Sequence, residues 1–367
     1  NFRNTIAKND IVTVPTGVQF PIYFKLISAI NSACEGVGFF TVQIDAVPEA
    51  FSIPDIELCD DVFSGSSTDG STANINLRDH ISEILGPNQQ ESDYSVSFHT
   101  SPEGASTNTD RIENDENYQN LVPDTFTSNS LVEQEIYVRV ESRSSQGCFN
   151  ANTSFKIRIF PLPTLPEPLE ILLVCDSVDD LRDRISTVDL TVKTEAILNG
   201  RSNLEVVYYA SEQDAQNFTE IQNPTSYTTD SSIIQFPSDM ESDDPAIQTI
   251  YFRLIDQTGI QCPSLISSFD VVIYPEPAIQ PIAAVEECDN DDDGDDTNGI
   301  IQSFDLISKR TEILAGRALE DYEITFHRSQ EDADSGNEPL ALNYTNENPT
   351  ETIFVRMVQK ISGCTNS

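Results

Sequence analysis

Short runs of alternating apolar and polar residues recur along the chain, as at residues 94–98 and 155–159. Alternation with a period of two is the pattern of a β-strand with one buried face. The runs are rich in Val, Ile, Phe, Tyr and Thr, and 20 Pro and 15 Gly residues interrupt them. This pattern predicts a mainly β protein built from many short strands.

One strand motif occurs four times, each time as an apolar and aromatic run that ends near a basic residue. Its copies start at Ile22, Ile136, Ile250 and Ile353. A cysteine follows the basic residue eight or nine positions later in each copy, at Cys34, Cys148, Cys262 and Cys364. Three copies continue into a second alternating run that ends in proline, and the sequence stops at Ser367 where the fourth would begin.

A second block precedes this motif in each period. It starts with Cys-Asp at Cys59, Cys175 and Cys288, and a polar loop rich in Asp follows. An amphipathic segment comes next and ends in Ile-Leu close to a Gly, which suits a helix C-cap. Its copies are residues 77–86, 190–200 and 306–316. A strand and a turn then recur, so the pattern predicts one short helix per repeat and a period of roughly 115 residues.

This period predicts four domains. Residues 1–50 are the C-terminal half of a β-sandwich repeat, 51–164 and 165–278 are whole repeats, and 279–367 is a repeat lacking its last strand. About seven strands and one helix in roughly 115 residues favour an immunoglobulin-like sandwich. The proline-rich joints favour semi-rigid spacers, so we expect tandem repeats arranged as an extended rod.

The seven cysteines allow two regular pairing schemes. Pairing within repeats joins Cys59 with Cys148, Cys175 with Cys262 and Cys288 with Cys364, and leaves the partner of Cys34 upstream. Pairing across the joints joins Cys34 with Cys59, Cys148 with Cys175 and Cys262 with Cys288. The strand after Cys148 carries the chain about 40 Å away at about 3.3 Å per residue, which favours the first scheme if the first strand and the hairpin turn share an end. Either scheme implies an oxidising compartment.

The formal net charge is -41, from 20 Lys and Arg against 61 Asp and Glu. A surface this acidic repels phosphate backbones and anionic lipid headgroups, so we expect no nucleic-acid partner and no membrane insertion. No run of about 18 apolar residues and no N-terminal signal pattern occurs, so we also expect that this sequence neither spans a membrane nor carries its own export signal.

Acidic residues are densest at residues 289–296, within a stretch from 256 to 308 that has no Lys or Arg. Clustered carboxylates with a Gly for a sharp turn suit calcium, which takes six to eight oxygen ligands. The twelfth position of the loop is Ile300 rather than the Glu of an EF-hand, so ligands must also come from elsewhere. The predicted ligands are Asp289, Asp291, Asp293, Asp295, Asn298 and Asp305. A solvated acidic loop is the alternative.

The equivalent loops of the two preceding repeats are less acidic, and calcium binding there is left open. Their acidic residues are Asp60, Asp61 and Asp69, and Asp176, Asp179, Asp180 and Asp183.

Catalysis finds little support in the sequence. His99 and His327 occupy equivalent positions, but Tyr209 replaces them in the middle repeat, which favours a structural role. No phosphate loop, G-x-S-x-G or H-E-x-x-H motif occurs, so we expect no enzyme activity. We expect the motif arginines to face outward and pair with the abundant acid; these are Arg139, Arg253 and Arg356.

Taken together, the motifs resemble the tandem repeats of very large Bacteroidota surface proteins, the SprB-like gliding-motility adhesins. The resemblance rests on Cys-Asp with its acidic loop, Phe304-Asp305-Leu306, residues 322–333 and Gly363-Cys364. Gln261 departs from it, because it replaces the Gly before Cys262. Asp176-Ser177-Val178 also resembles the short O-glycosylation motif of Bacteroidota, which makes Ser177 a candidate glycan site.

The resemblance implies a cell-surface filament, exported by type IX secretion through a signal outside this sequence and moved by the gliding machinery. It would grip external polysaccharide or other surface ligands. We therefore expect structural and adhesive stalk repeats. The alternatives are accessory repeats of a secreted polysaccharide-active enzyme, or a carbohydrate-binding module, which would need aromatic residues on an exposed strand face. The absence of Trp counts against the latter.

Overall fold

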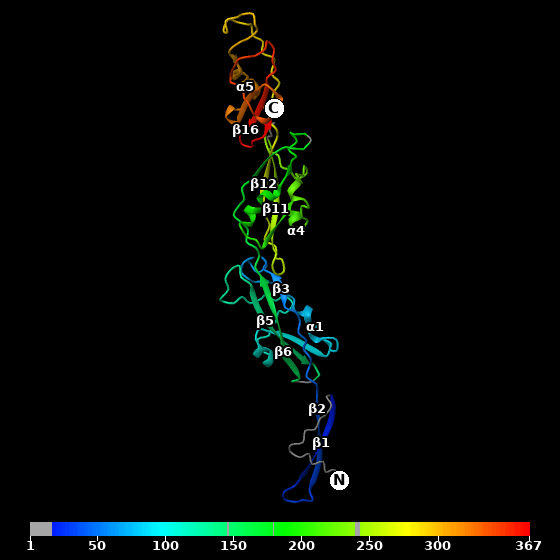
Figure 1. The fold of residues 1–367 in the computed structure, drawn as a ribbon. Helices are drawn as coiled ribbons and strands as arrows, with labels where there is room; N and C mark the ends of the chain where they lie inside the picture. The colour runs from blue at the N-terminus through cyan, green and yellow to red at the C-terminus, as the bar shows by residue number, and fades with distance from the viewer. Residues whose placement is uncertain (1–16, 145–146, 179, 239–242) are drawn as a thin grey trace. The chain divides into compact units, whose positions relative to one another are not determined.

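A computed structural model describes residues 17–144, 147–178, 180–238 and 243–367. The chain divides into two compact units, Asn1–Leu162 and Pro163–Ser367. In the described residues, no helix is long and apolar enough to cross a membrane. The elements of both units are labelled in Figure 1.

The first unit begins with a hairpin that belongs to the half repeat. Strands β1 (Val18–Ile27) and β2 (Glu35–Ile44) pair antiparallel along their whole length. Of the expected half repeat at residues 1–50, residues 1–16 lie outside the described residues.

The whole repeat of the first unit is built on a four-stranded sheet in the order β3-β6-β5-β4. Its strands are β3 (Ile56–Cys59), β4 (Tyr94–His99), β5 (Val132–Ser142) and β6 (Phe149–Phe160). Its helical segments are η1 (Leu77–His80), α1 (Ile81–Leu85) and α2 (Pro102–Thr107). β5 pairs antiparallel with both of its neighbours, whereas β3 runs parallel to β6.

The second unit starts with a repeat of the same design. Its sheet has the order β7-β12-β11-β9, and a two-stranded ladder, β10-β8, lies outside that sheet. The strands are β7 (Leu172–Cys175), β8 (Thr187–Val188), β9 (Leu204–Tyr209), β10 (Tyr227–Thr228), β11 (Ala246–Asp256) and β12 (Ser267–Tyr274). The helical segments are η2 (Leu190–Lys193), α3 (Thr194–Leu198), α4 (Glu212–Asn217) and η3 (Pro224–Ser226).

The third repeat repeats most of this design. Its strands are β13 (Phe304–Asp305), β14 (Tyr322–His327), β15 (Asn343–Tyr344), β16 (Phe354–Gln359) and β17 (Thr365–Asn366), and its helical segments are α5 (Leu306–Leu314), η4 (Leu319–Asp321) and α6 (Gln330–Ser335). In the other repeats the first strand forms by pairing in parallel with the last strand. In the third repeat the last strand is represented only by the two residues of β17, which pair with β16. Residues 285–288, where the first strand would lie, form no strand.

The core of each repeat lies between the main sheet and a second layer. In the middle repeat Ile250 and Val271 of the sheet are fully buried against Leu190 and Ile197 of the helical layer. The ladder adds Val188, which is also buried. Tandem, mainly β repeats of immunoglobulin-like sandwich architecture are thus confirmed.

Each repeat has a second short α-helix where the sequence predicts a turn, so the expectation of one helix per repeat is wrong. These helices are α2, α4 and α6. A serine caps each of them by accepting a hydrogen bond from the backbone N–H three residues later, at 2.9 to 3.1 Å, and the serines are Ser101, Ser211 and Ser329. Serine is a favoured N-cap, so its recurrence was a usable signal.

The motif arginines hold the C-terminal end of this second helix, which corrects the expectation that they face outward to pair with acid. Arg139 is buried and donates to the Ala105 carbonyl at 3.0 Å, although it also pairs with Glu141. Arg253 and Arg356 donate in the same way to the carbonyls of Ala215 and Ala333. Cations at helix C-termini satisfy carbonyls that have no partner within the helix.

The paired histidines are buried structural residues. His99 is fully buried, and its Nδ1 lies 2.6 Å from the Thr109 carbonyl. A carbonyl can only accept, so Nδ1 carries the proton and Nε2 accepts from the Ser97 hydroxyl at 2.9 Å. His327 has the same two kinds of partner in the third repeat. A neutral side chain with both nitrogens used has a structural part in the fold.

Replacing His99 with Tyr, the residue of the middle repeat, tests this arrangement. Burial lowers the pKa of His99 below its usual 6.5, with the nearby Arg111 and Arg139 charges acting the same way against the Thr109 hydrogen bond. The unfolded chain therefore binds the proton at higher pH than the folded chain, and stability falls as pH drops through about 6.5. We expect the free energy of unfolding of the first unit, measured by urea titration, to lose this part of its pH dependence in His99→Tyr.

His80→Gln is the matched control, because the His80 side chain is 29% exposed. Comparing the two variants separates the loss of the buried histidine from the loss of a histidine at a more exposed position. An unchanged profile in His99→Tyr would contradict the assignment.

Candidate functional site

The feature with the clearest functional consequence is a disulfide between successive repeats. Cys175, the last residue of β7 in the second repeat, is bonded to Cys364 in the hairpin after β16 of the third repeat, with a Cα–Cα distance of 5.5 Å. The bond closes a sequence separation of 189 residues. Cys59 and Cys262 are also disulfide-bonded.

The predicted pairing within repeats is wrong. Cys175 pairs with Cys364 rather than Cys262, and Cys148 and Cys288 are free thiols, as is the exposed Cys34. The pairing of cysteines across a single joint is wrong for the same reason.

The parallel pairing of the first strand explains this error. Cys175 lies opposite Tyr274, the last residue of β12, whereas Cys262 lies before β12 begins. The eight residues of β12, at about 3.3 Å each, separate its two ends by about 26 Å. The first cysteine and the hairpin cysteine of one repeat therefore lie at opposite ends, and the expectation of a shared end fails.

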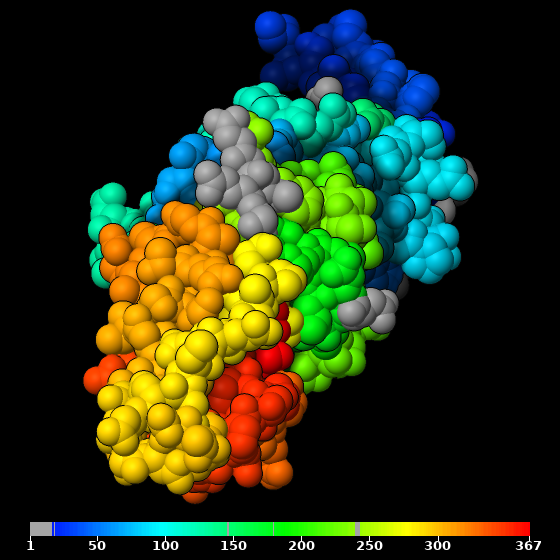
Figure 2. Space-filling view, turned by 90° about the horizontal axis from the view of Figure 1, so that it is seen from above, coloured from blue at the N-terminus to red at the C-terminus, as the bar shows by residue number. Residues whose placement is uncertain are grey.

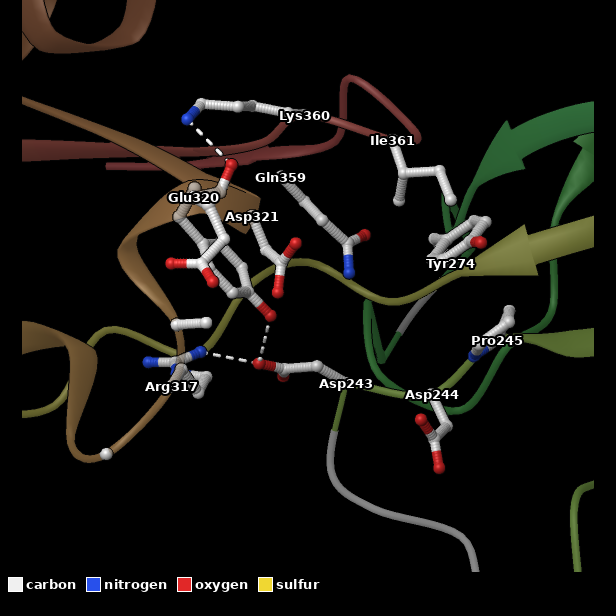
Figure 3. A pocket seen from close by; sticks show the side chains of 13 residues that line it. Asp243, Asp244, Pro245, Tyr274, Arg317, Glu320, Asp321, Gln359, Lys360 and Ile361 are labelled. Carbon is white, nitrogen blue, oxygen red and sulfur yellow. Dashed lines mark hydrogen bonds and ion pairs between the residues drawn. The ribbon is translucent and has the colours of Figure 1, made fainter.

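Asp243 links the second and third repeats beside this disulfide. Its Oδ1 accepts from Arg182 Nη2 of its own repeat at 3.0 Å. Its Oδ2 accepts from Arg317 Nη1 at 2.5 Å and from the Tyr322 hydroxyl at 3.1 Å, both in the third repeat. Figure 3 shows Asp243 reaching toward Arg317.

The environment of Asp243 favours its charged form. Burial raises the pKa of this carboxyl, but the hydrogen bonds from Arg182 and Arg317 and the charge of Arg317 outweigh burial and hold it below 3.8. The side chain is only 11% exposed, so solvent screens these contacts little. Asp243 is thus an anionic bridge between two repeats.

Arg317 also fixes the peptide that connects the two repeats. Its guanidinium donates to the carbonyl of Ala278 in the joint and, at 2.9 Å, to that of Leu314 at the end of α5. Arg201 makes the same contacts with Thr164 and Leu198.

In the first repeat an amide takes the place of this arginine. Gln89 donates to the carbonyl of Glu49 at 2.8 Å and to that of Leu85, the last residue of α1, at 3.0 Å. The sequence analysis missed this contact in all three repeats. Its signal is an arginine or glutamine one to three residues after the glycine that follows the helix.

The rest of the joint combines an apolar contact with an open polar cleft. Val272 and Tyr274 of β12 pack with Cys364. Asn366 donates to the Pro277 carbonyl at 2.9 Å. A cleft of about 790 Å³ opens beside these contacts, and its walls include Asp243, Tyr274, Arg317, Asp321 and Gln359 (Figure 3).

The aspartate of each Cys-Asp pair closes the acidic loop that follows it. Asp289 accepts from the backbone N–H of Gly299 at 2.7 Å. Asp60 and Asp176 do the same for the residues ten and eight positions later, at 2.8 and 2.6 Å. Burial raises the pKa of both Asp60 and Asp176 above 3.8. This aspartate therefore has a local structural role in all three repeats.

Four of the other predicted calcium ligands accept hydrogen bonds within the chain, and these are Asp293, Asp295, Asn298 and Asp305. Asp293 accepts from the Asp295 N–H and the Asn298 amide, and Asp295 accepts from the Thr297 N–H and hydroxyl. Asp305 caps α5 by accepting from the N–H of Ile307. The loop at 289–296 lies on the outside of the molecule, in the yellow segment of Figure 2, and the Asp291 side chain is exposed.

The predicted calcium ligands are not gathered around one point in the structure. Among the residues that the structure describes, no three acidic, His or Cys side chains are placed to hold a metal ion. Calcium binding at this loop stays a prediction. Of the sparser loops, Asp179 lies outside the described residues.

The candidate glycan site Ser177 is exposed, but its hydroxyl has local partners. It lies 3.0 Å from the Ser186 hydroxyl and accepts from the Thr187 N–H at 3.2 Å. Glycosylation of Ser177 stays a prediction.

Asp243→Asn tests the bridge between the repeats. The neutral amide loses two charged hydrogen bonds, so we expect the free energy of unfolding of the second unit to fall by about 1–3 kcal/mol at pH 7. Because the folded pKa of Asp243 is lowered, its contribution is present above about pH 3.8 and is lost as pH falls through the folded value. The two proteins should therefore converge in acid, as measured by chemical denaturation across pH.

Asp270→Asn is the control, because Asp270 accepts from Thr249 on the sheet of the second repeat, away from the joint. A difference between native protein and Asp243→Asn that persists unchanged below pH 3 would contradict the ionic bridge.

The calcium prediction has a direct measurement. An extracellular-type site with a dissociation constant near 10⁻⁴ M should stabilise the protein by about 2.7 kcal/mol at 10 mM calcium. The melting temperature should therefore rise with calcium and return on adding EDTA, and Asp291→Asn should reduce the rise. Magnesium at equal ionic strength is the control, and an equal rise with magnesium, or none with calcium, would contradict the site.

The comparisons with known proteins place these features in a family. No curated protein matches the chain. Among solved structures, the chicken CNTN1 FN1–FN3 domains match with 11% identity and a TM-score of 0.24, over 69% of this chain and 77% of theirs. The zebrafish RET cadherin-like domains 1 to 4 match with 10% identity and a TM-score of 0.18, over 70% of this chain and 57% of theirs. Likeness at this level carries no structural argument.

A family model, the Flavobacterium inter-domain disulphide bond domain, matches residues 55–163, 171–277 and 284–367. These three matches cover most of the chain, and the family description agrees with the disulfide between Cys175 and Cys364. The chain belongs to the Flavobacterium inter-domain disulphide bond domain family, in three tandem copies.

Proposed function

We propose that the chain is a load-bearing segment of an extracellular adhesive stalk, without catalysis of its own. The observation that carries this proposal is the disulfide between Cys175 and Cys364. A bond between repeats adds little to catalysis or to the recognition of a small ligand, but it prevents two repeats from being pulled apart. The disulfides also indicate an oxidising, extracellular environment.

The position of the bond suits a chain under tension. Force applied before Cys175 and after Cys364 passes through the disulfide and bypasses the 189-residue separation between them. The body of the second repeat and nearly all of the third repeat are then protected from extension. A bond within one repeat would leave the joint itself unprotected.

The repeat register describes this bond in general terms. Cys175 is the first cysteine of its repeat and Cys364 is the hairpin cysteine of the next repeat. We propose that bonding of a first cysteine to the hairpin cysteine of the following repeat is the rule of this stalk.

The finer parts of the proposal rest on the family and on resemblance. A Flavobacterium family and a resemblance to SprB-like adhesins support a place on the cell surface, export by type IX secretion and a role in gliding. The partners would be external polysaccharide or other surface ligands together with the gliding machinery.

Single-molecule stretching tests the load-bearing role. Handles are inserted at Glu167 and at the C-terminus, so that the Cys175–Cys364 bond lies between them. In the native protein the chain between Cys175 and Cys364 should stay unextended. Cys364→Ser should add about 60 nm of extension, because the sequence separation of 189 residues is released at about 3.4 Å per residue.

Cys288→Ser is the matched control, because Cys288 is a free thiol within the same span. It should behave like the native protein. Peptide mapping without reduction should recover Cys175 joined to Cys364. Equal extension in native protein and Cys364→Ser would overturn the load-bearing role, and a peptide joining Cys175 to Cys262 would overturn the register.

A further inference from the structure

The polar cleft at the joint of the second and third repeats is a further candidate site. Its volume is about 790 Å³, which lies within the range of small-ligand sites. The second repeat contributes Asp244 and Tyr274 to its walls, and the third repeat contributes Glu320, Asp321 and Gln359. Figure 3 shows these side chains around the cleft. A ligand held there would contact two successive repeats at once.

Gln359 places an unused hydrogen-bond donor in this cleft. The residue is only 8% exposed. Ser362 accepts from the Cys364 N–H at 3.2 Å and donates its hydroxyl proton to Gln359 Oε1 at 2.7 Å, which fixes the orientation of the amide. Nε2 points into the cleft beside Asp321, and no described residue accepts a hydrogen bond from it (Figure 3). A buried amide usually has a partner, so this atom marks a place for an acceptor from outside the chain.

The Tyr274 hydroxyl has the same character on the side of the second repeat. Tyr274 is 9% exposed, and its side chain packs with Val272 and Cys364. Its hydroxyl lines the cleft and has no hydrogen-bond partner in the part of the chain that the structure describes. Burial and the charge of Asp244 raise the pKa of Tyr274 above its usual 10.0, so the hydroxyl keeps its proton and can donate or accept.

The carboxylates of the cleft outnumber its available cations. Arg317 is used by Asp243 and by carbonyls of the joint. Lys360 Nζ donates to the Glu320 carbonyl at 2.8 Å rather than to a carboxylate. Within the described residues, the Glu320 and Asp321 side chains have no ion-pair partner. The cleft therefore attracts positive charge, and the net charge of -41 adds to this attraction.

The walls of the cleft favour an organic cation over a metal ion or a sugar. Among the residues with described positions, no three acidic, His or Cys side chains are placed to hold a metal ion. Ile361 lines the cleft, is 65% exposed and offers apolar surface to an aliphatic side chain. Tyr274 and Tyr322 are buried, so neither presents a flat aromatic face to a sugar ring.

The strand that follows the hairpin leads away from the cleft. In the register of β16 with β17, Val358 lies opposite Thr365 and Met357 lies opposite Asn366. Each further residue of β17 is therefore farther from Gln359 and from the joint. This strand does not close the cleft.

We propose that this cleft binds an arginine or lysine residue of a basic partner protein. The cationic head would pair with Glu320 and Asp321, and the aliphatic stem would lie on Ile361. The backbone carbonyl of the same residue would accept from Gln359 Nε2. The inference goes beyond the load-bearing role, because it assigns a partner to the joint and does not depend on force.

Fluorescence anisotropy with the full chain tests the site. The probe is a labelled pentapeptide with one arginine among glycines, and a matched peptide has citrulline, the uncharged analogue, in place of arginine. We expect the arginine peptide to bind and the citrulline peptide to bind at least tenfold more weakly. The double variant Glu320→Gln with Asp321→Asn should weaken binding at least tenfold. Gln359→Met, which leaves the charge unchanged, should weaken it at least threefold.

Asp292→Asn with Glu331→Gln is the matched control, because it removes the same charge from exposed positions of the third repeat outside the cleft. It should bind the arginine peptide within twofold of the native protein, and circular dichroism should show all variants folded.

The proposal is overturned if the arginine peptide does not bind, if the citrulline peptide binds equally well, or if Gln359→Met binds like the native protein. Equal losses in the control and in the Glu320 and Asp321 variant would show general attraction to an acidic chain and also overturn it. Tighter binding of chitosan oligosaccharide, lost in the same double variant, would instead identify an amino sugar as the ligand and overturn the peptide assignment. None of these results changes the stretching experiment, so the stalk and the cleft fail separately.

Discussion

The parallel pairing of the first strand with the last strand decides most of what this chain can do. It places Cys59 and Cys175 at the end of the repeat that the last strand reaches, opposite Phe160 and Tyr274. The hairpin cysteine precedes that strand and lies at the other end. A repeat with this topology cannot close its own disulfide, and Cys175 bonds instead to the hairpin cysteine of the next repeat, Cys364. Bonding between repeats is therefore a consequence of strand order rather than of any special feature of the joint.

Polar side chains fix the loops and joints that the sheets leave open. The end of the first helix is held by Gln89, Arg201 or Arg317, and the second helix by the arginine of the strand motif. Each contact satisfies backbone carbonyls that would otherwise lack a partner within the helix. At the joint within the second unit, Arg317 has a further role, because it also pairs with Asp243 of the preceding repeat. One side chain thus links the helix end, the connecting peptide and the preceding repeat.

The repeats, the strands and the loop positions could be predicted from the sequence, because they depend on local periodicity. The second helix of each repeat could have been predicted from its serine N-cap. The helix is only six residues long, which is why a turn was expected there. The disulfide partners could not be predicted in this way, because the alternation of apolar and polar residues along β7 and β12 is the same whether the strands pair parallel or antiparallel. The joint contacts of Asp243 were hidden for a similar reason, since one aspartate among 61 acidic residues has no local signature.

The contacts of the basic residues explain why much of the negative charge at the surface is not neutralised by ion pairs. The chain has three acidic residues for each basic one, yet Arg201, Arg253 and Arg356 donate to backbone carbonyls. These arginines offset charge without forming ion pairs at the exposed surface, and most carboxylates stay solvated. Like charge on successive repeats is repulsive within a Debye length of about 8 Å at physiological salt. A covalent bond at the joint is insensitive to that repulsion, whereas a joint made only of hydrogen bonds would weaken as salt falls. The disulfide and the acidic surface are therefore compatible parts of one design, in which charge favours separation of the repeats and the Cys175–Cys364 bond limits it.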